Sequence, residues 1–450
     1  MKPRQSPAVD DQGHLFRMEL AHLVDQEHPL VRLAGEVDWA QLDSTFGMNY
    51  SEKGRPGIPT RLMVALHYLK YTFDLSDDAV VQAWVENPYW QYFSGSKFFE
   101  HELPIDPSSM TRWRARVGDA GAEELLKQTI SAGLRLKIIK PTQLARVNVD
   151  TTVQEKNIRH PTDARSLSRA RERLVDLAKS EGIELRQSYV RVGKQELHQQ
   201  SRYAHARQFK RARRSVKKLR TYLGRVIRDI ERKTVDSEIS VEMQELLATG
   251  RKLLVQQRNS KNKIYSVHAP EVECISKGKA HKRYEFGCKV SIAATSAGGW
   301  VVAALAQHGN PYDGHTLAGT IEQVERLTDR TPNEVFVDMG YRKHDYMGTS
   351  LVHVDRRRRG TIPRSTWKRM KHRAAIEPTI GHLKDNKRLD RNRLKGVIGD
   401  KINVILSAAG MNFHKIMRAL AKTPDVLAQI LAWLLGFRIN QSTALQFQAR

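Results

Sequence analysis

The stretch Arg146-Val-Asn-Val-Asp-Thr-Thr152 places one carboxylate, Asp150, at the end of a short apolar run. The arrangement returns in Glu334-Val-Phe-Val-Asp-Met-Gly-Tyr341, where Asp338 follows the apolar residues. Short apolar runs of this kind predict buried β-strands. One such acid would be an ordinary turn residue. Two of them in a strongly basic chain predict a site for a divalent metal ion.

Composition points to a nucleic acid as the partner. The 450 residues carry a formal net charge of +26, and a field of that sign attracts polyanions. Hydrophobic residues make up 40% of the chain, enough for a packed core, and the length predicts two or three domains. Two cysteines exclude a disulfide framework and favour a reducing compartment.

Neither end of the chain predicts a membrane segment. The N-terminus Met-Lys-Pro-Arg-Gln-Ser-Pro lacks the apolar stretch of a signal peptide. The late apolar run from Val426 to Phe437 is shorter than the roughly 20 residues that span a bilayer, so it predicts a buried helix. We therefore expect a soluble, cytoplasmic protein.

Residues 1–125 are typical of a helical domain. Pro59 precedes apolar residues at helical spacing, and Ser76 is placed to cap a second helix. A turn at Asp106 then leads into a basic helix, which carries Arg112, Arg114 and Arg116. This helix is a candidate DNA-recognition helix of a helix-turn-helix unit. A packed bundle with a solvated basic face is the alternative.

Residues 161–263 predict a coiled insertion. Apolar residues recur at alternating steps of three and four, as in an a/d heptad seam: Phe209, Ala212, Val216, Leu219, Leu223, Val226 and Ile230. A similar spacing from Ile239 to Leu253 predicts a second helix folded back as a hairpin. Thirteen Lys/Arg occur between Arg202 and Lys233. They form either a solvated face or an arm that follows phosphates.

From Tyr284 onward the apolar pattern has a period of two, which predicts strands. Residues 296–299 make a turn to a partner strand at 300–305, and Asp313 is placed to cap a helix over 316–327. Strands at 335–338 and 351–354 and a basic helix from Thr366 follow. The order predicts an α/β fold, a mixed sheet flanked by helices, built from residues 126–160 and 264–420. Residues 421–450 would add a C-terminal helix and tail.

Phosphodiester chemistry explains why two acids at strand ends would be useful. Two divalent ions about 3.5–4 Å apart stabilise the attacking and the leaving oxygen together. Such ions need a third carboxylate from a later segment, and there are five candidates: Asp345, Asp355, Glu377, Asp385 and Asp390.

Glu377 stands out among these candidates. At helical spacing, Arg373 lies one turn before Glu377 and Lys384 two turns after it, so both cations could hold phosphates beside a metal. The alternative is an ordinary surface ion pair, worth about 0.3–0.5 kcal/mol. Pro378 complicates both interpretations because it removes one helical N–H.

Together these residues resemble the DDE transposases of bacterial insertion sequences, whose catalytic domain is ribonuclease H-like. A large group of them has the signature Tyr-x2-Arg-x3-Glu-x6-Lys, and Arg373-x3-Glu377-x6-Lys384 matches three of its four positions. Met370 stands at the tyrosine position, so the role of that tyrosine does not carry over. The group's Asp-x-Gly-Tyr-x-Gly appears here as Asp338-Met-Gly-Tyr-Arg-Lys343, and Gly57 to Tyr71 resembles the domain before the catalytic core.

The resemblance implies a function. Asp150, Asp338 and Glu377 would be catalytic and would hold two Mg²⁺ ions, with Mn²⁺ as a substitute. Arg373 and Lys384 would position DNA phosphates. The protein would cut DNA at the terminal inverted repeats of its element and join the freed 3′ ends to target DNA. It would act as a homo-oligomer, at least a dimer, in the bacterial cytoplasm at the nucleoid.

Basic residues before Glu377 strengthen the expectation of DNA binding. Nine Lys/Arg and no acid lie between Arg356 and Arg373, a density that binds phosphates strongly. Trp367 and Tyr341 could stack on bases, or they could belong to the core. The predicted DNA-binding cations of this stretch include Arg356, Arg357, Arg358 and Arg359.

Other chemistries find little support in the sequence. His268, Cys274, His281 and Cys288 lack the spacing of structural zinc sites. The chain has no Gly-x-Ser-x-Gly elbow and no Walker A loop, so a serine nucleophile and bound nucleotide are not expected. Two alternatives stay open: a nuclease of the same fold that cuts without joining, and a non-catalytic basic DNA-binding protein.

Overall fold

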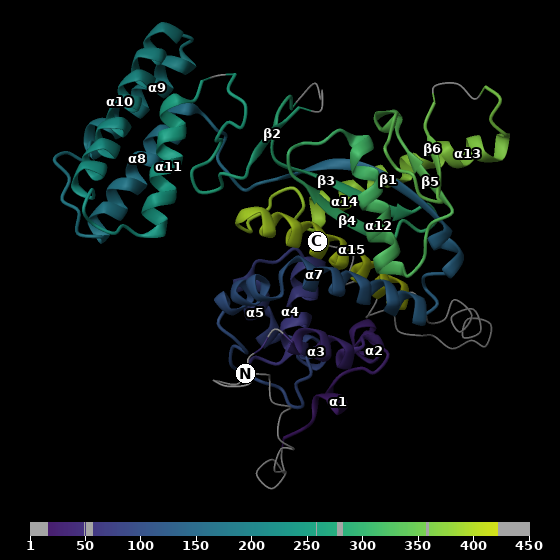
Figure 1. The fold of residues 1–450 in the computed structure, drawn as a ribbon. Helices are drawn as coiled ribbons and strands as arrows, with labels where there is room; N and C mark the ends of the chain where they lie inside the picture. The colour runs from purple at the N-terminus through teal and green to yellow at the C-terminus, as the bar shows by residue number, and fades with distance from the viewer. Residues whose placement is uncertain are drawn as a thin grey trace, which may run out of the picture.

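Helices surround one sheet, and a separate group of helices stands beside them (Figure 1). The computed structural model describes residues 17–48, 50, 57–257, 259–276, 282–356 and 360–421. Within these ranges no helix is long and apolar enough to cross a membrane. Several predicted features lie outside the described residues: the helix from Val426 to Phe437, His281, Arg357, Arg358 and Arg359.

The N-terminal part is helical, as predicted. Its helices are α1 (Leu20–Leu23), α2 (Pro29–Glu36), α3 (Trp39–Gly47), α4 (Thr60–Thr72), α5 (Asp77–Glu86), α6 (Pro88–Phe93) and α7 (Ser108–Arg135). Pro59 precedes α4, and the Ser76 hydroxyl accepts a hydrogen bond of 3.0 Å from the Ala79 N–H at the start of α5. A kink at Gly118, where φ is +65°, interrupts α7.

The sheet is mixed. Its strands are β1 (Arg146–Glu155), β2 (Glu273–Ile275), β3 (Glu285–Thr295), β4 (Val301–Gln307), β5 (Glu334–Val337) and β6 (Leu351–Val354). The order is β2-β3-β1-β5-β6, and β4 also pairs with β3. β1 is antiparallel to β3 and parallel to β5. This is the predicted ribonuclease H-like arrangement, with β1 in the middle and the 296–299 turn between β3 and β4.

Helices cover both faces of the sheet. They are α12 (Leu317–Thr328), α13 (Arg364–His372), α14 (Ile376–Asn386) and α15 (Gly396–Ala421), with the 3₁₀ turns η2 (Pro141–Ala145), η3 (Asp313–Thr316), η4 (Met339–Tyr341) and η5 (Arg373–Ala375). Ser291 on β3 bonds Thr320 of α12, whereas the Asn148 amide on β1 donates to the carbonyl of Arg373 before α14. Ser291 is paired with Thr151, and side chains alternate along a strand. α12 and α14 therefore lie on opposite faces.

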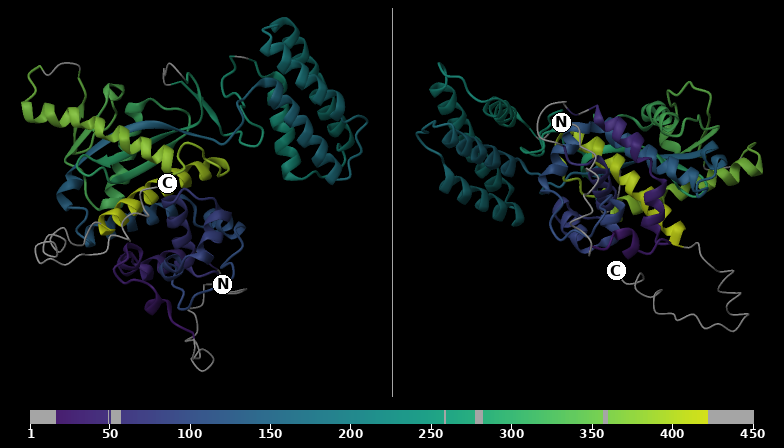
Figure 2. Two further views of the ribbon diagram at one scale, coloured as in Figure 1. Left: turned by 180° about the vertical axis from the view of Figure 1, so that it is seen from behind. Right: turned by 90° about the horizontal axis from the view of Figure 1, so that it is seen from below.

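The insertion differs from the prediction. It contains four helices rather than a two-helix hairpin: α8 (Asp163–Ser180), α9 (Val190–His205), α10 (Phe209–Lys233) and α11 (Val241–Val255). Figures 1 and 2 show them packed together beside the rest of the molecule. The heptad seam of α10 is largely buried, although Phe209 is exposed. The periodicity of α10 correctly predicted which of its residues are buried. In the structure α10 packs against α8 and α9 as well as against α11.

Candidate active site

Asp338 directly follows β5, whereas Asp150 lies within the neighbouring parallel strand β1, five residues before its end, so the predicted strand-end position is wrong for Asp150. Arg146, Val147 and Asn148 of β1 pair in register with Glu334, Val335 and Phe336 of β5. Continued by two residues beyond the last pair, the same register would bring Asp150 opposite Asp338. Both side chains are half-buried. The register therefore carries the two predicted acids toward the same end of the β1–β5 pair.

Backbone N–H groups hold both carboxylates in place. The Thr151 N–H donates to Asp150 Oδ1 at 2.7 Å, and the Gly340 N–H donates to Asp338 Oδ1 at 2.8 Å. A Cβ at Gly340 would lie 2.9 Å from Asp338 Oδ1. A side chain at position 340 would therefore push against this carboxylate.

Arg373 links Asp150 to the third predicted acid. Its Nη1 lies 3.5 Å from Asp150 Oδ2, and its Nη2 lies 3.9 Å from Glu377 Oε1. Arg373 belongs to η5 and Glu377 to the first turn of α14, so the two are not on one continuous α-helix. Pro378 is also in that first turn, where its missing N–H costs nothing. Glu377 faces solvent with a side chain 66% exposed.

Asp313 is a fourth carboxylate at this edge, and its predicted role as a helix cap is wrong. No side chain caps α12. Instead, Asp313 Oδ1 accepts hydrogen bonds from the Thr151 hydroxyl at 2.9 Å and from Lys289 Nζ at 3.0 Å. Its Oδ2 lies 3.1 Å from the position that a Cβ of Gly340 would take, so Asp313 and Asp338 border the same small volume. Asp is one of the common capping residues before a helix. The sequence therefore offered no reason to expect that Asp313 would bond Thr151 and Lys289 instead.

Tyr341 is part of the core beneath these acids rather than a DNA contact. Its side chain is fully buried. Burial raises the pKa of its hydroxyl well above the usual value, and the negative charges of Asp150 and Asp313 raise it further. The predicted role of Tyr341 in DNA binding is therefore wrong, because a fully buried ring cannot reach a base.

Arg114 is also buried and cannot serve as a recognition residue. Its guanidinium donates to both carboxylate oxygens of Asp77, at 2.9 and 2.6 Å. Arg112 and Arg116, which lie on the same turns of α7, are exposed, and Arg116 stacks over Tyr50. The helix therefore presents two of the three predicted cations to solvent, because the third completes an ion pair inside the N-terminal part.

The remaining predicted cations lie in two places. Lys384 Nζ is 3.8 Å from the buried Glu285 on β3. Arg356 is exposed at the end of β6. In α13, Lys371 lies 4.5 Å from the ring centre of the half-buried Trp367. Met370, at the signature's tyrosine position, is buried.

Comparisons with known proteins agree with this geometry. Residues 18–116 match the model of a family described as "Transposase domain (DUF772)", and residues 254–413 match that of "Transposase DDE domain". A Rhizobium meliloti protein described as "Uncharacterized protein ORF8 in nfe locus" is 53% identical over 206 residues, which are 46% of this chain and all of that protein. No solved structure matches the chain. With matches to a transposase domain and to a transposase DDE domain, the chain belongs to the DDE transposases of insertion sequences.

Proposed function

We propose that this transposase hydrolyses DNA strands at the ends of its element and transfers the freed 3′ ends into target DNA. The observation that carries the proposal is the parallel register of β1 and β5, whose continuation would bring Asp150 opposite Asp338. The link from Asp150 through Arg373 to Glu377 supports a three-acid site.

The donor atoms fit magnesium. Asp150, Asp338 and Glu377 offer carboxylate oxygens, the hard ligands that Mg²⁺ prefers. These residues would hold two Mg²⁺ ions, with Mn²⁺ as a substitute, and Asp313 is near enough to Asp338 to join them. When bound, such ions stabilise charge on the attacking and the leaving oxygen of a phosphodiester. The exposure of Glu377 leaves its side of the site open to a large substrate.

The protein's own residues would orient the reaction. The central strand β1 and the Thr151 N–H fix Asp150, while the Gly340 N–H fixes Asp338. Arg373 provides positive charge between Asp150 and Glu377 and would contact a DNA phosphate once those acids are neutralised. A guanidinium suits this exchange because it can donate hydrogen bonds to either a carboxylate or a phosphate.

DNA would lie along the basic segments. The predicted cations Arg356 to Arg359, the exposed cations of α13 and Lys384 would contact the DNA backbone. Arg112 and Arg116 would contact the terminal inverted repeats from the N-terminal domain, residues 1–125. The catalytic domain would comprise 126–160 and 264–420, with the insertion at 161–263. Two element ends require at least a dimer.

Strand cleavage of the DNA that flanks the coding region tests the proposal. The purified chain should cut labelled duplexes carrying matched inverted repeats in Mg²⁺ and should join precleaved ends to a plasmid. Asp150→Asn, Asp338→Asn and Glu377→Gln should each lower cleavage at least about 100-fold while leaving DNA binding intact. Glu322→Gln, the same change at an exposed glutamate of α12, is the control.

The outcomes separate three functions. Cleavage without joining would identify a nuclease of the same fold. Full binding without Mg²⁺-dependent cleavage, equal in the wild type and the variants, would identify a DNA-binding protein whose acids are structural.

A further inference from the structure

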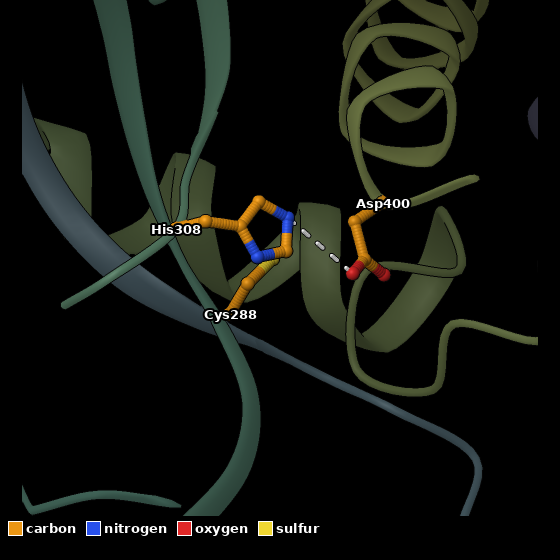
Figure 3. Close-up of side chains that lie close together, drawn as sticks. All are labelled: Cys288, His308 and Asp400. Atoms are coloured by element: carbon orange, nitrogen blue, oxygen red, sulfur yellow. Dashed lines mark ion pairs between the residues drawn. The ribbon is translucent and has the colours of Figure 1, made fainter. Parts of the chain in front are cut away.

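A second group of metal-ligating side chains lies away from the acids at the β1–β5 edge. Cys288 on β3, His308 directly after β4 and Asp400 on α15 bring one ligand atom each within 4.8 Å of one another. Figure 3 shows the His308 ring between Cys288 and Asp400. Cys288 pairs with Gln154, four residues along β1 from Asp150, so this group is distinct from the DDE acids.

His308 has the environment of a metal ligand. Its Nδ1 lies 3.4 Å from Glu273 Oε1, which also accepts the Gly309 N–H at 2.7 Å. Its buried Nε2 has no hydrogen-bond partner among the described residues and lies 3.6 Å from Asp400 Oδ2. Metal-ligating histidines usually pair their second nitrogen with a carboxylate in this way. The Nε2–Oδ2 distance is long for a hydrogen bond and suits two ligands of one ion.

Asp400 has one oxygen available for the same ion. Its Oδ1 accepts from the Asn392 amide at 2.6 Å and from Lys156 Nζ at 2.8 Å, which leaves Oδ2 on the side of His308. Burial raises the pKa of this carboxyl despite the lysine. A cation beside Oδ2 would favour the charged form.

The charges around the group also favour an added cation. Lys156 forms ion pairs with both Asp400 and Glu271, each at 2.8 Å, and Glu273 approaches from the other side of His308. Two carboxylates thus contact the Lys156 ammonium, and a third, Glu273, contacts His308. Buried carboxylates with too little positive charge nearby are costly.

Cys288 completes the donor set. Its thiol is fully buried, and its contact in the described structure is the Gln154 amide at 3.6 Å. Burial raises the pKa of this thiol well above its usual value. A coordinating metal ion deprotonates a thiol outright.

We propose that Cys288 Sγ, His308 Nε2 and Asp400 Oδ2 bind one zinc-class divalent ion, with Glu273 as a positioning residue for His308. A sulfur, nitrogen and oxygen donor set selects zinc rather than magnesium. The ion joins β3, the end of β4 and α15 close to Lys156, where the chain leaves β1 for the insertion. The ion would therefore hold these three parts of the fold together near the start of the insertion.

Metal content of the untagged full-length chain tests this proposal independently of DNA cleavage. After loading with zinc chloride and gel filtration, the wild type should keep about one zinc per chain by mass spectrometry. Cys288→Ser and His308→Gln should lose it, and Glu273→Gln should bind about 10-fold more weakly. Cobalt(II) in place of zinc should give a thiolate charge-transfer band that Cys288→Ser abolishes.

Two controls give the result its meaning. Cys274→Ser alters the other cysteine, on β2, and should keep both the zinc and the cobalt band. Asp150→Asn should keep the zinc while losing cleavage, which separates this proposal from the proposed function. A wild type that holds no zinc, or equal loss in Cys274→Ser and Cys288→Ser, would overturn the site. In the first case the His308 ring lies between Glu273 and Asp400 without a metal ion.

Discussion

Arg373 contacts two carboxylates that would otherwise repel each other. Its side chain is 12% exposed, so water screens these contacts only in part. Without a bound ion, the guanidinium is the cation between Asp150 and Glu377. A divalent ion bound by the same acids would release it. Removing Arg373 therefore affects the metal-free protein most.

Arg373→Ala should lower the stability of the chain in chelator by about 1–3 kcal/mol, because it removes a largely buried guanidinium that contacts two carboxylates. Added Mg²⁺ should then raise the melting temperature of the variant more than that of the wild type. Lys371→Ala, which removes an exposed cation of α13, is the control and should respond as the wild type does. If Mg²⁺ raises the melting temperature of Arg373→Ala and of the wild type equally, the ion and the guanidinium do not occupy the same position between the acids.

Asp313→Asn tests the fourth carboxylate. If Asp313 supports an ion at Asp338, the Mg²⁺ concentration for half-maximal cleavage should rise about 10-fold. Thermal unfolding in chelator measures how much of the effect comes from the lost Lys289 ion pair. A less stable variant with unchanged Mg²⁺ dependence would show that Asp313 only anchors η3 to the sheet.

At the scale of elements, a buried charged group joins α4, α5 and α7. Asp77 at the start of α5 accepts from Lys70 on α4 and from Arg114 on α7, and these contacts hold the pKa of Asp77 far below its usual value. His67 lies beside them. Its Nδ1–H donates to the Met63 carbonyl at 2.7 Å, and its Nε2 accepts from Arg114 at 3.3 Å. Such a histidine must be neutral.

His67 therefore predicts acid sensitivity. Burial, together with the charge of Arg114, lowers its pKa from 6.5 to about 3. Between these values the unfolded chain binds a proton that the folded chain does not, so stability falls as the pH decreases below 6.5. Well below pH 6.5, this loss approaches about 1.4 kcal/mol per pH unit.

The pH effect of His67 can be measured by urea unfolding between pH 7 and pH 4.5. His67→Asn keeps a donor for the Met63 carbonyl but does not titrate, so its stability should fall less steeply than that of the wild type. Parallel pH profiles would contradict a neutral, buried His67.

At the scale of the whole molecule, α15 connects the N-terminal helices to the catalytic sheet. It packs on α4 and α7 on one side and on β4 on the other. At Gly410 the approach is closest: a Cβ there would lie 2.6 Å from Tyr71 Cβ and 2.7 Å from its carbonyl carbon. The two parts therefore fit only if this position lacks a side chain.

Gly410→Ala should destabilise the chain by about 1–3 kcal/mol, since backbone atoms of α4 would have to move. Gly319→Ala in α12 is a matched control, because nothing lies within 4 Å of its added Cβ. That variant should gain about 0.5–1 kcal/mol from better helix propensity. Denaturant midpoints measure both. A Gly410→Ala variant as stable as the wild type would mean that α4 and α15 are not held this closely.

The sequence by itself predicted most of the elements and proposed three acids for the site. The alternation from Tyr284 and the Ser76 cap depend on neighbours within a few residues, so these signals do not depend on the tertiary setting. β2 and the helices α8 and α9 were not predicted. The apolar runs before Asp150 and Asp338, and the family signature around Glu377, are local signals of the same kind, and the role of these acids stays a prediction.

Only the tertiary structure decided the roles that depend on distant partners. Arg114 and Tyr341 resemble surface residues in the sequence, but Asp77 and the sheet enclose them. Asp313 meets Thr151 across 162 positions, and Cys288 meets His308 and Asp400 through three different elements, with no short spacing to reveal them. Local periodicity records which face of an element is buried. Which polar residues are buried with it depends on the partners that distant parts of the chain provide for their charges and hydrogen bonds.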